Sequence, residues 1–271
     1  MSNGTGTTPA IDTTRLTRHF GPLVAVDAVT IAVPASNIFG LLGPNGAGKS
    51  TTIKMLTTLL VPTSGTAHVA GADIVRDAPR VRERIGYIPQ MLSADGELSG
   101  YENLLISAKL HHVASAERQT RIDQALAFMG LTEASSALVR TYSGGMIRRL
   151  EIAQAMLHRP AVLFLDEPTV GLDPVARRVV RDHIREVRGE FGTTVVMTTH
   201  DMDEADEMCD TLAIMHHGRV SAIGSPASLK ASVGPEATLD DVFIHFSGST
   251  LDEGGGYRDV VRTRRTARRL G

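Results

Sequence analysis

The sequence predicts an α/β fold into which a block of helices is inserted. Three observations support this prediction. Short apolar runs typical of buried strands recur before residue 90 and again after residue 160. A glycine-rich loop follows one of these runs directly and leads into a helix. From about residue 92 to residue 159 the strand pattern gives way to helical periodicity, so we expect a helical subdomain there.

The composition of the 271-residue chain is that of an ordinary globular protein, with 42% hydrophobic and 21% charged residues. A net charge of −2 indicates no strongly charged partner, and no apolar run reaches the roughly 18 residues that span a membrane. Cys209 is the only cysteine, which excludes an intrachain disulfide and suits a reducing cytosol. Residues 1–10 lack the features of a targeting peptide, and we expect a disordered leader there.

Three strands are expected ahead of the glycine-rich loop, at residues 11–18, 29–33 and 38–42. The turn-prone segment Phe20-Gly21-Pro22 separates the first two. The pattern around Phe20 leaves two interpretations open. Its ring is either an exposed aromatic that stacks on a purine or an ordinary part of the core.

The glycine-rich loop at residues 43–51 fits the phosphate-binding pattern G-x-x-x-x-G-K-[ST] in full. A strand, such a loop and a helix in this order direct backbone N–H groups and the positive end of the helix dipole toward one point. Lys49 would reach the β and γ phosphates of a nucleotide, and the Ser50 hydroxyl would ligate Mg²⁺. The predicted phosphate-binding residues are Gly43, Pro44, Asn45, Gly46, Ala47, Gly48, Lys49, Ser50 and Thr51.

Beyond the helix that follows this loop, a turn and short strands lead to the helical block. The apolar repeat Met146, Leu150, Ala153 and Leu157 predicts one of its helices, which Pro160 closes. The remaining elements expected here are a turn at 62–65, a strand at 67–70, a polar helix at 80–84, a strand at 85–88 that ends before Gln90, and helices at 102–110 and 116–129.

Two apolar strands end in residues suited to phosphoryl transfer. Asp166 and Glu167 directly follow the run Val162–Leu165, and His200 follows the strand at 194–198. Parallel sheets place functional groups at the carboxyl ends of their strands. Asp166 suits metal binding and Glu167 suits the polarisation of an attacking water molecule, while His200 can donate a hydrogen bond to a γ phosphate.

Ser143-Gly144-Gly145 opens the helix that contains Met146 and forms a second candidate anion-binding nest. Two phosphate sites in one chain allow two interpretations. Either the chain holds two ligands, or the second nest covers a nucleotide that another copy holds.

The last third of the chain continues the α/β pattern and then changes. Asp173-Pro174 predicts a helix start, and Asp201 with Glu204 predicts a second start of the capping-box type. A hairpin is expected at 212–215 and 220–223, and closing helices at 226–232 and 239–246. Residues 249–271 are rich in arginine, which indicates a solvated disordered tail or, as an alternative, a contact with anionic headgroups or an acidic partner.

Taken together, these motifs make residues 11–224 resemble the ATP-binding subunits of ABC transporters. Residues 43–51 resemble the Walker A motif, Val162–Glu167 the Walker B strand, and Tyr142–Met146 the signature motif. Gln90, Asp173 and His200 fall at the Q-loop glutamine, the D-loop aspartate and the switch histidine. The resemblance implies a P-loop NTPase (RecA-like) core with an antiparallel β subdomain and an inserted α-helical subdomain.

The same resemblance implies how the chain would act. Two ATPase domains, as a homodimer or a heterodimer, would enclose ATP and Mg²⁺, each phosphate loop facing the other copy's Ser143–Gly145. Phe20 would stack on adenine, Gln90 would contact Mg²⁺ and the membrane partner, and Asp173 would contribute to the nucleotide site. A multi-span permease in a separate chain would hold the subunit at the cytoplasmic face of the membrane, and no nucleic-acid partner is expected.

The signature departs from the commonest form, because Tyr142 and Met146 replace its outer Leu and Gln, while the Ser-Gly-Gly nest is intact. A C-terminal helical extension at residues 225–248, with Thr238–Phe243, is similar to that of daunorubicin-resistance exporters. We therefore expect export of a drug-like or lipid-like substrate. The alternatives are an importer ATPase, or a soluble ABC ATPase acting on nucleic acid or ribosomes; the latter fits poorly, because the chain lacks a long coiled coil and carries one motif set.

Overall fold

The structure, a computed structural model, describes residues 8–247. Most of the expected leader and the arginine-rich tail lie outside these residues. Ala10, which we had assigned to the leader, already belongs to the fold, because its N–H donates to Val33 O and its carbonyl accepts from the Ala70 N–H, both at 2.8 Å.

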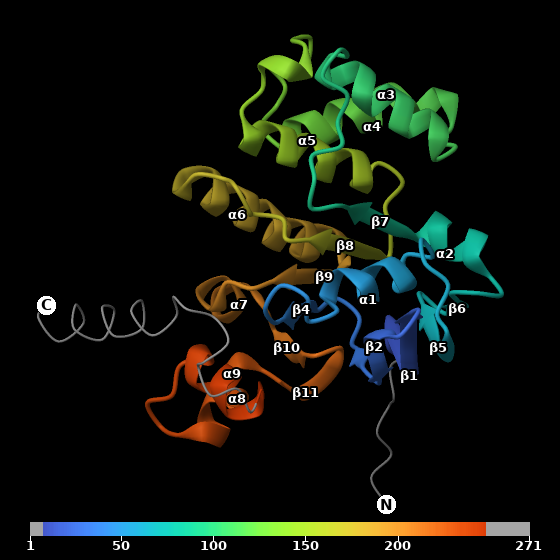
Figure 1. The fold of residues 1–271 in the computed structure, drawn as a ribbon. Helices are drawn as coiled ribbons and strands as arrows, with labels where there is room; N and C mark the ends of the chain where they lie inside the picture. The colour runs from blue at the N-terminus through green and yellow to red at the C-terminus, as the bar shows by residue number, and fades with distance from the viewer. Residues whose placement is uncertain (1–7, 248–271) are drawn as a thin grey trace, which may run out of the picture.

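A mostly parallel sheet forms the centre of the molecule (Figure 1). Its strand order is β11-β10-β4-β9-β8-β7, and only β11 runs antiparallel to its neighbour. Strands β4, β8 and β9 are buried along their whole length, which explains the apolar runs at 38–42, 162–165 and 195–197. The strands are β4 (Ile38–Leu42), β7 (Ile85–Ile88), β8 (Val162–Asp166), β9 (Thr194–Thr199), β10 (Thr211–His216) and β11 (Arg219–Gly224).

An antiparallel sheet lies beside the parallel one, in the order β2-β1-β5-β6 with β3 paired to β1. The strand predicted at 29–33 was misplaced. β2 ends at Val29, and only Ala32–Val33 form β3. β2 is an edge strand with an exposed first half, and it begins at Leu23, six residues before the predicted start. The sheet comprises β1 (Ile11–Phe20), β2 (Leu23–Val29), β3 (Ala32–Val33), β5 (Ser64–Val69) and β6 (Ala72–Asp73).

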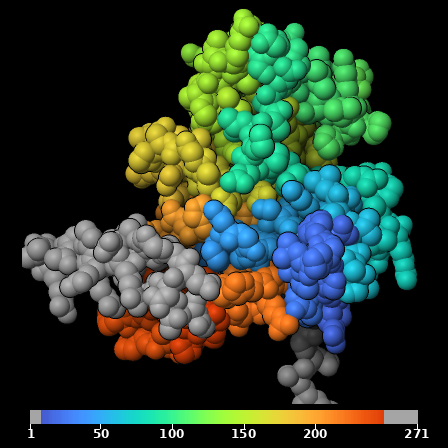
Figure 2. All heavy atoms as spheres, in the orientation of Figure 1, coloured from blue at the N-terminus to red at the C-terminus, as the bar shows by residue number. Residues whose placement is uncertain are grey.

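Three helices and a short 3-10 turn gather at one end of the molecule, which Figure 2 shows as a separate green projection. Ser99 caps the first of them through a capping box with Glu102. The second helix, Ser115–Phe128, stops before Gly130 as the sequence predicted, and Gly130 has a φ of +61°. The elements are α3 (Gly100–Leu110), α4 (Ser115–Phe128), η1 (Val139–Thr141) and α5 (Gly144–Met156).

The other helices cover the central sheet, and two hydrophobic cores form, one on each of its faces. Alternate residues of one strand enter different cores; Leu163 packs with the helical side and Phe164 with the antiparallel side. Within residues 8–247 no helix is long and apolar enough to cross a membrane. These helices are α1 (Lys49–Leu56), α2 (Ala78–Arg84), α6 (Pro174–Phe191), α7 (Met202–Met208), α8 (Pro226–Val233) and α9 (Leu239–Ser247).

The register of the parallel strands brings their following loops to one edge. Leu42 of β4 pairs with Thr199 of β9, and Asp166 of β8 pairs with Thr198. Ile88 of β7 pairs with Leu165, one residue before Asp166. The phosphate loop, Gln90, Glu167 and His200 therefore leave the sheet side by side.

Candidate functional site

The phosphate loop joins β4 to α1 in an open cradle. Gly46 and Gly48 adopt φ angles of +82° and +100°, which favour glycine, and a Cβ at Gly46 would meet no atom within 4 Å. Gly48 caps α1 without a side chain, so the N–H groups of the first turn are left for a ligand. Lys49 is buried and donates to Gly43 O at 2.8 Å and Pro44 O at 3.1 Å. This cradle fits a polyphosphate.

Asp166 joins the cradle to the central sheet. Its Oδ1 accepts a hydrogen bond from Ser50 Oγ at 3.0 Å and from Thr198 Oγ1 at 2.6 Å. A hydroxyl and a carboxylate this close offer the oxygen ligands that Mg²⁺ takes in nucleotide sites. Two of the three predicted metal residues, Ser50 and Asp166, therefore fit a magnesium ion, whereas the side chain of the third, Gln90, donates to Glu167.

Glu167 is the point at which the other polar groups meet. Its φ is +50°, so the chain turns sharply at the end of β8, and its N–H donates to Thr198 Oγ1 at 2.9 Å. The side chain, 6% exposed, lies 3.5 Å from Lys49 Nζ and 3.1 Å from His200 Nδ1. Gln90 Nε2 donates to the other carboxylate oxygen at 3.3 Å. Four residues predicted for catalysis are thus in one cluster.

Burial shifts the pKa values of two residues at this cluster, Lys49 and Tyr87. Burial lowers the pKa of Lys49, and the nearby Glu167 and Asp166 carboxylates oppose that effect. Burial, with a smaller contribution from Asp166, raises the pKa of Tyr87 to about 12. Tyr87 therefore stays neutral beside the cluster at physiological pH.

The second nest lies apart from the phosphate loop. Ser143 is exposed and caps α5 by accepting the Met146 N–H at 3.3 Å. A Cβ on Gly144 or Gly145 would approach Leu172 and Ala176, at 3.3 and 2.7 Å, so the nest faces the start of α6. Asp173 caps that helix through the Ala176 N–H. Its carboxylate is thus occupied within the chain.

Phe20 ends β1 and is 44% exposed, which rules out the interpretation as a core residue. The Arg18 guanidinium lies 4.7 Å from the centre of its ring. The adjoining β2 approaches the phosphate loop, because a Cβ on Gly48 would lie 2.6 Å from Ala25 O. An exposed ring on this hairpin remains available for stacking.

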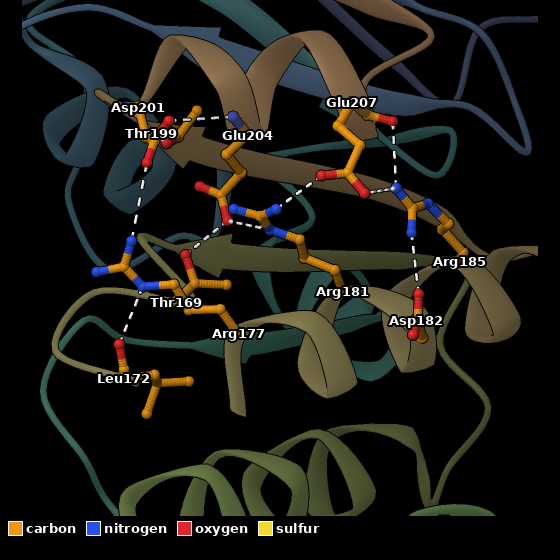
Figure 3. Close-up of polar contacts among 10 residues, drawn as sticks. All are labelled: Thr169, Leu172, Arg177, Arg181, Asp182, Arg185, Thr199, Asp201, Glu204 and Glu207. Carbon is orange, nitrogen blue, oxygen red and sulfur yellow. Dashed lines mark hydrogen bonds and ion pairs between the residues drawn. The ribbon is translucent and has the colours of Figure 1, made fainter. Parts of the chain in front are cut away.

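A polar network behind the cluster joins the loop after β8 to α7 (Figure 3). The Thr169 hydroxyl donates to Glu204 Oε1 at 2.6 Å, and Arg181 Nε lies 3.6 Å from the same oxygen. Glu204 was predicted to close a capping box, but only half of that prediction is correct. Asp201 accepts the Glu204 N–H, whereas the Glu204 side chain turns inward to Thr169. The network therefore fixes the segment after Glu167 relative to the segment after His200.

Comparison with known proteins identifies the family. The family model described as ABC transporter matches residues 26–170. The daunorubicin/doxorubicin resistance ATP-binding protein DrrA of Streptomyces peucetius is 46% identical over 227 residues, which are 84% of this chain and 68% of that protein. The chain belongs to the ABC transporter family. The fold and the resemblance predicted from the sequence are confirmed.

Other relatives agree with this assignment. The Nod factor export ATP-binding protein I of Ralstonia nicotianae is 39% identical over 83% of this chain and 70% of its own length. A solved structure titled as the ATP binding subunit of an ABC transporter superposes with a TM-score of 0.78 at 28% identity and covers 88% of this chain and 99% of its own. This ABC protein binds ATP and is an ATPase.

Sequence reasoning missed three groups that organise this ABC ATPase site. Thr198 bonds both Asp166 and Glu167, and its only signal was a hydroxyl inside an apolar strand before His200. Arg148 and Glu151 form a buried ion pair behind Gln90. Their spacing of three residues suggests a helical pair, but not its burial.

Proposed function

We propose that this ABC ATPase powers export of a drug-like or lipid-like substrate through a separate membrane permease, to which it binds at the cytoplasmic face of the membrane. The observation that carries the proposal is the cluster of Lys49, Gln90 and His200 around Glu167, beside the phosphate cradle. The names of the DrrA and Nod factor relatives support export over import.

The residues of the cluster have separate roles in this proposal. Lys49 and the N–H groups of α1 hold the phosphates, and Ser50 with Asp166 holds Mg²⁺, which supplies charge neutralisation when bound. Glu167 orients the attacking water and takes up its proton, His200 donates a hydrogen bond toward the γ phosphate, and Gln90 positions Glu167.

The exposed second nest supports a two-chain arrangement. Ser143 is exposed, and Gly144 and Gly145 lie against the start of α6, so the nest suits a nucleotide held by another copy. Asp173 lies at the same surface as the cap of α6. Two chains, identical or paralogous, would then enclose ATP between each phosphate loop and the partner's nest.

A groove between the sheet and the helical block supports a membrane partner. It measures about 360 Å³, and Leu59, Tyr87, Ser93 and His111 are among its lining residues. Leu59 is 61% exposed, and Met91, just before Ser93 in the chain, is 82% exposed. Unpartnered apolar side chains beside the Gln90 segment suit a cytoplasmic segment of the permease.

The variant Glu167→Gln tests the proposal. It should retain ATP binding and lose about 100-fold or more of its hydrolysis rate, because general-base catalysis contributes at least that much. Light scattering should show an ATP-dependent dimer. Glu117→Gln, which alters an exposed carboxylate of an ion pair on α4, is the control and should hydrolyse normally.

The same variant tests the partner. Affinity purification of the Glu167→Gln chain from detergent-solubilised host membranes with Mg-ATP should recover a multi-span membrane protein, and that protein's fold separates an exporter from an importer. Unchanged hydrolysis would refute the role of Glu167. Recovery of ribosomal or DNA-repair proteins without any membrane protein would refute transport.

A further inference from the structure

The buried ion pair of Arg148 and Glu151 lies behind the Gln90 segment, and no step of the proposed function uses it. Arg148 is 1% exposed and is among the largest fully buried side chains, and its Nη1 lies 2.9 Å from Oε2 of Glu151. Both residues lie on α5. Buried ion pairs contribute little to stability compared with an apolar pair of similar volume, since desolvation opposes their attraction. The role of Arg148 and Glu151 therefore follows from the segments to which they are hydrogen-bonded.

The pair holds the loop that follows β7 at two points. Arg148 donates from Nη1 to Pro89 O and from Nη2 to Gln90 O, each at 2.8 Å. Glu151 Oε1 accepts from the Ser93 hydroxyl at 3.0 Å and from the Ser93 backbone N–H. The planar guanidinium holds its N–H donors in a fixed geometry, which here serves both carbonyls and the Glu151 carboxylate at once. The Gln90 segment therefore cannot move independently of α5.

The pair also lies between the two nucleotide-facing parts of the chain. Ser143, the cap of α5, begins the second nest, and Arg148 follows five residues later on the same rigid helix. On the other side, the Gln90 side chain donates to Glu167 Oε2. An unbroken series of contacts thus runs from the nest through Arg148 and Gln90 to the catalytic carboxylate.

We propose that Arg148 and Glu151 are positioning residues that couple the Ser143–Gly145 nest to Glu167 by holding Gln90. A chain whose nest has engaged a nucleotide across the dimer would thereby align its own Glu167. The inference rests on the proposed roles of Glu167 and of the second nest.

The alternative is that the pair only joins the helical block to the sheet. Three variants separate the two explanations. Arg148→Met leaves Glu151 buried and unpaired, and the double variant Arg148→Met/Glu151→Met removes both charges, so it should unfold at higher temperature than Arg148→Met. Arg149→Met is the matched control, because Arg149 donates to Met129 O within the helical block at 2.7 Å and not to the Gln90 segment.

Steady-state hydrolysis by the full chain supplies the decisive measurement. In Arg148→Met and in the double variant we expect kcat to fall about tenfold with little change in KM for ATP, a loss of the size that positioning networks carry. Arg149→Met should keep kcat within about twofold of the parent. A double variant that regains both melting temperature and kcat would overturn the proposal, as would an equal loss of kcat in Arg149→Met.

A spin label reports the position of the Gln90 segment directly. Met91→Cys places the label next to Gln90 at an 82% exposed position, and the native Cys209 is buried. Relative to the parent chain, the label should become more mobile in the double variant and not in Arg149→Met. Equal mobility in the parent, the double variant and Arg149→Met would overturn the proposal. Normal hydrolysis by Glu167→Gln would refute the proposed function instead, so the two failures are distinguishable.

Discussion

Replacing Thr169 by valine removes one hydroxyl from the network that joins the segment after β8 to the segment after β9. The Thr169 hydroxyl donates to Glu204 Oε1 at 2.6 Å, and the two residues are only 5% and 2% exposed (Figure 3). Valine has nearly the same shape as threonine, so packing is retained. Glu204 would keep Arg181 as its partner, at 3.6 Å. The perturbation is therefore close to the loss of a single hydrogen bond.

The magnitude follows from the charge of the acceptor. A buried neutral hydrogen bond contributes about 1 kcal/mol to stability, and one to a charged group about 1.5–3 kcal/mol. The 2.6 Å separation is typical of a hydroxyl bonded to a carboxylate. We therefore expect Thr169→Val to lower the free energy of unfolding by about 2 kcal/mol, or the melting temperature by roughly 4–8 °C.

Urea unfolding of the full chain provides the assay, and Thr193→Val provides the control. Thr193 is equally buried, but its hydroxyl donates to the neutral Pro160 carbonyl at 3.2 Å, so its loss should cost about 1 kcal/mol. Combining Thr169→Val with Glu204→Gln should cost less than the sum of the two single changes. Equal losses in Thr169→Val and Thr193→Val, or strict additivity with Glu204→Gln, would refute the reasoning.

Two further predictions concern the helical block. Burial lowers the pKa of His158 from 6.5 to about 4, so the folded chain keeps it neutral while the unfolded chain protonates it below about pH 6.5. The free energy of unfolding therefore falls by about 2 kcal/mol as pH drops from about 6.5 toward 4, after allowance for the partial exposure of the ring. Urea unfolding at a series of pH values should show a smaller fall in His158→Gln. Parallel curves for the parent and the variant would contradict this. Gly145→Ala places a Cβ 2.7 Å from the Ala176 Cβ and should cost about 1–3 kcal/mol. Adding Ala176→Gly relieves the contact, so calorimetry should show the double variant losing less than the sum, and additive losses would exclude the clash.

The elements that sequence reasoning placed well are those whose signals are local. Val162–Leu165 is apolar at every position because both faces of β8 are buried. Asp173 and Ser143 cap helices through N–H groups three residues away. β2 was misplaced because apolar residues recur from Leu23 to Val33, and a local pattern does not show where in that segment pairing with β1 begins and ends.

The partners of buried polar side chains were not predictable in the same way. Glu204 fits a capping box in sequence, yet its carboxylate bonds Thr169, which is 35 positions away. Arg148 occupies a helix whose apolar stripe was correctly predicted, but its contacts at Pro89 and Gln90 lie 59 and 58 positions away. Nothing in a local pattern distinguishes such a buried arginine from an exposed one.

The sequence by itself determined the α/β class, the phosphate-binding loop and the residues that end each central strand, because hydrophobic periodicity, caps and glycine-rich turns act within a few residues. Only the tertiary structure decided that Lys49, Gln90 and His200 meet at Glu167, and that the second nest stays apart from them. The physical reason is strand register. Hydrogen bonding between β7, β8, β9 and β4 aligns loops from distant parts of the chain, and that alignment arises only when the sheet forms.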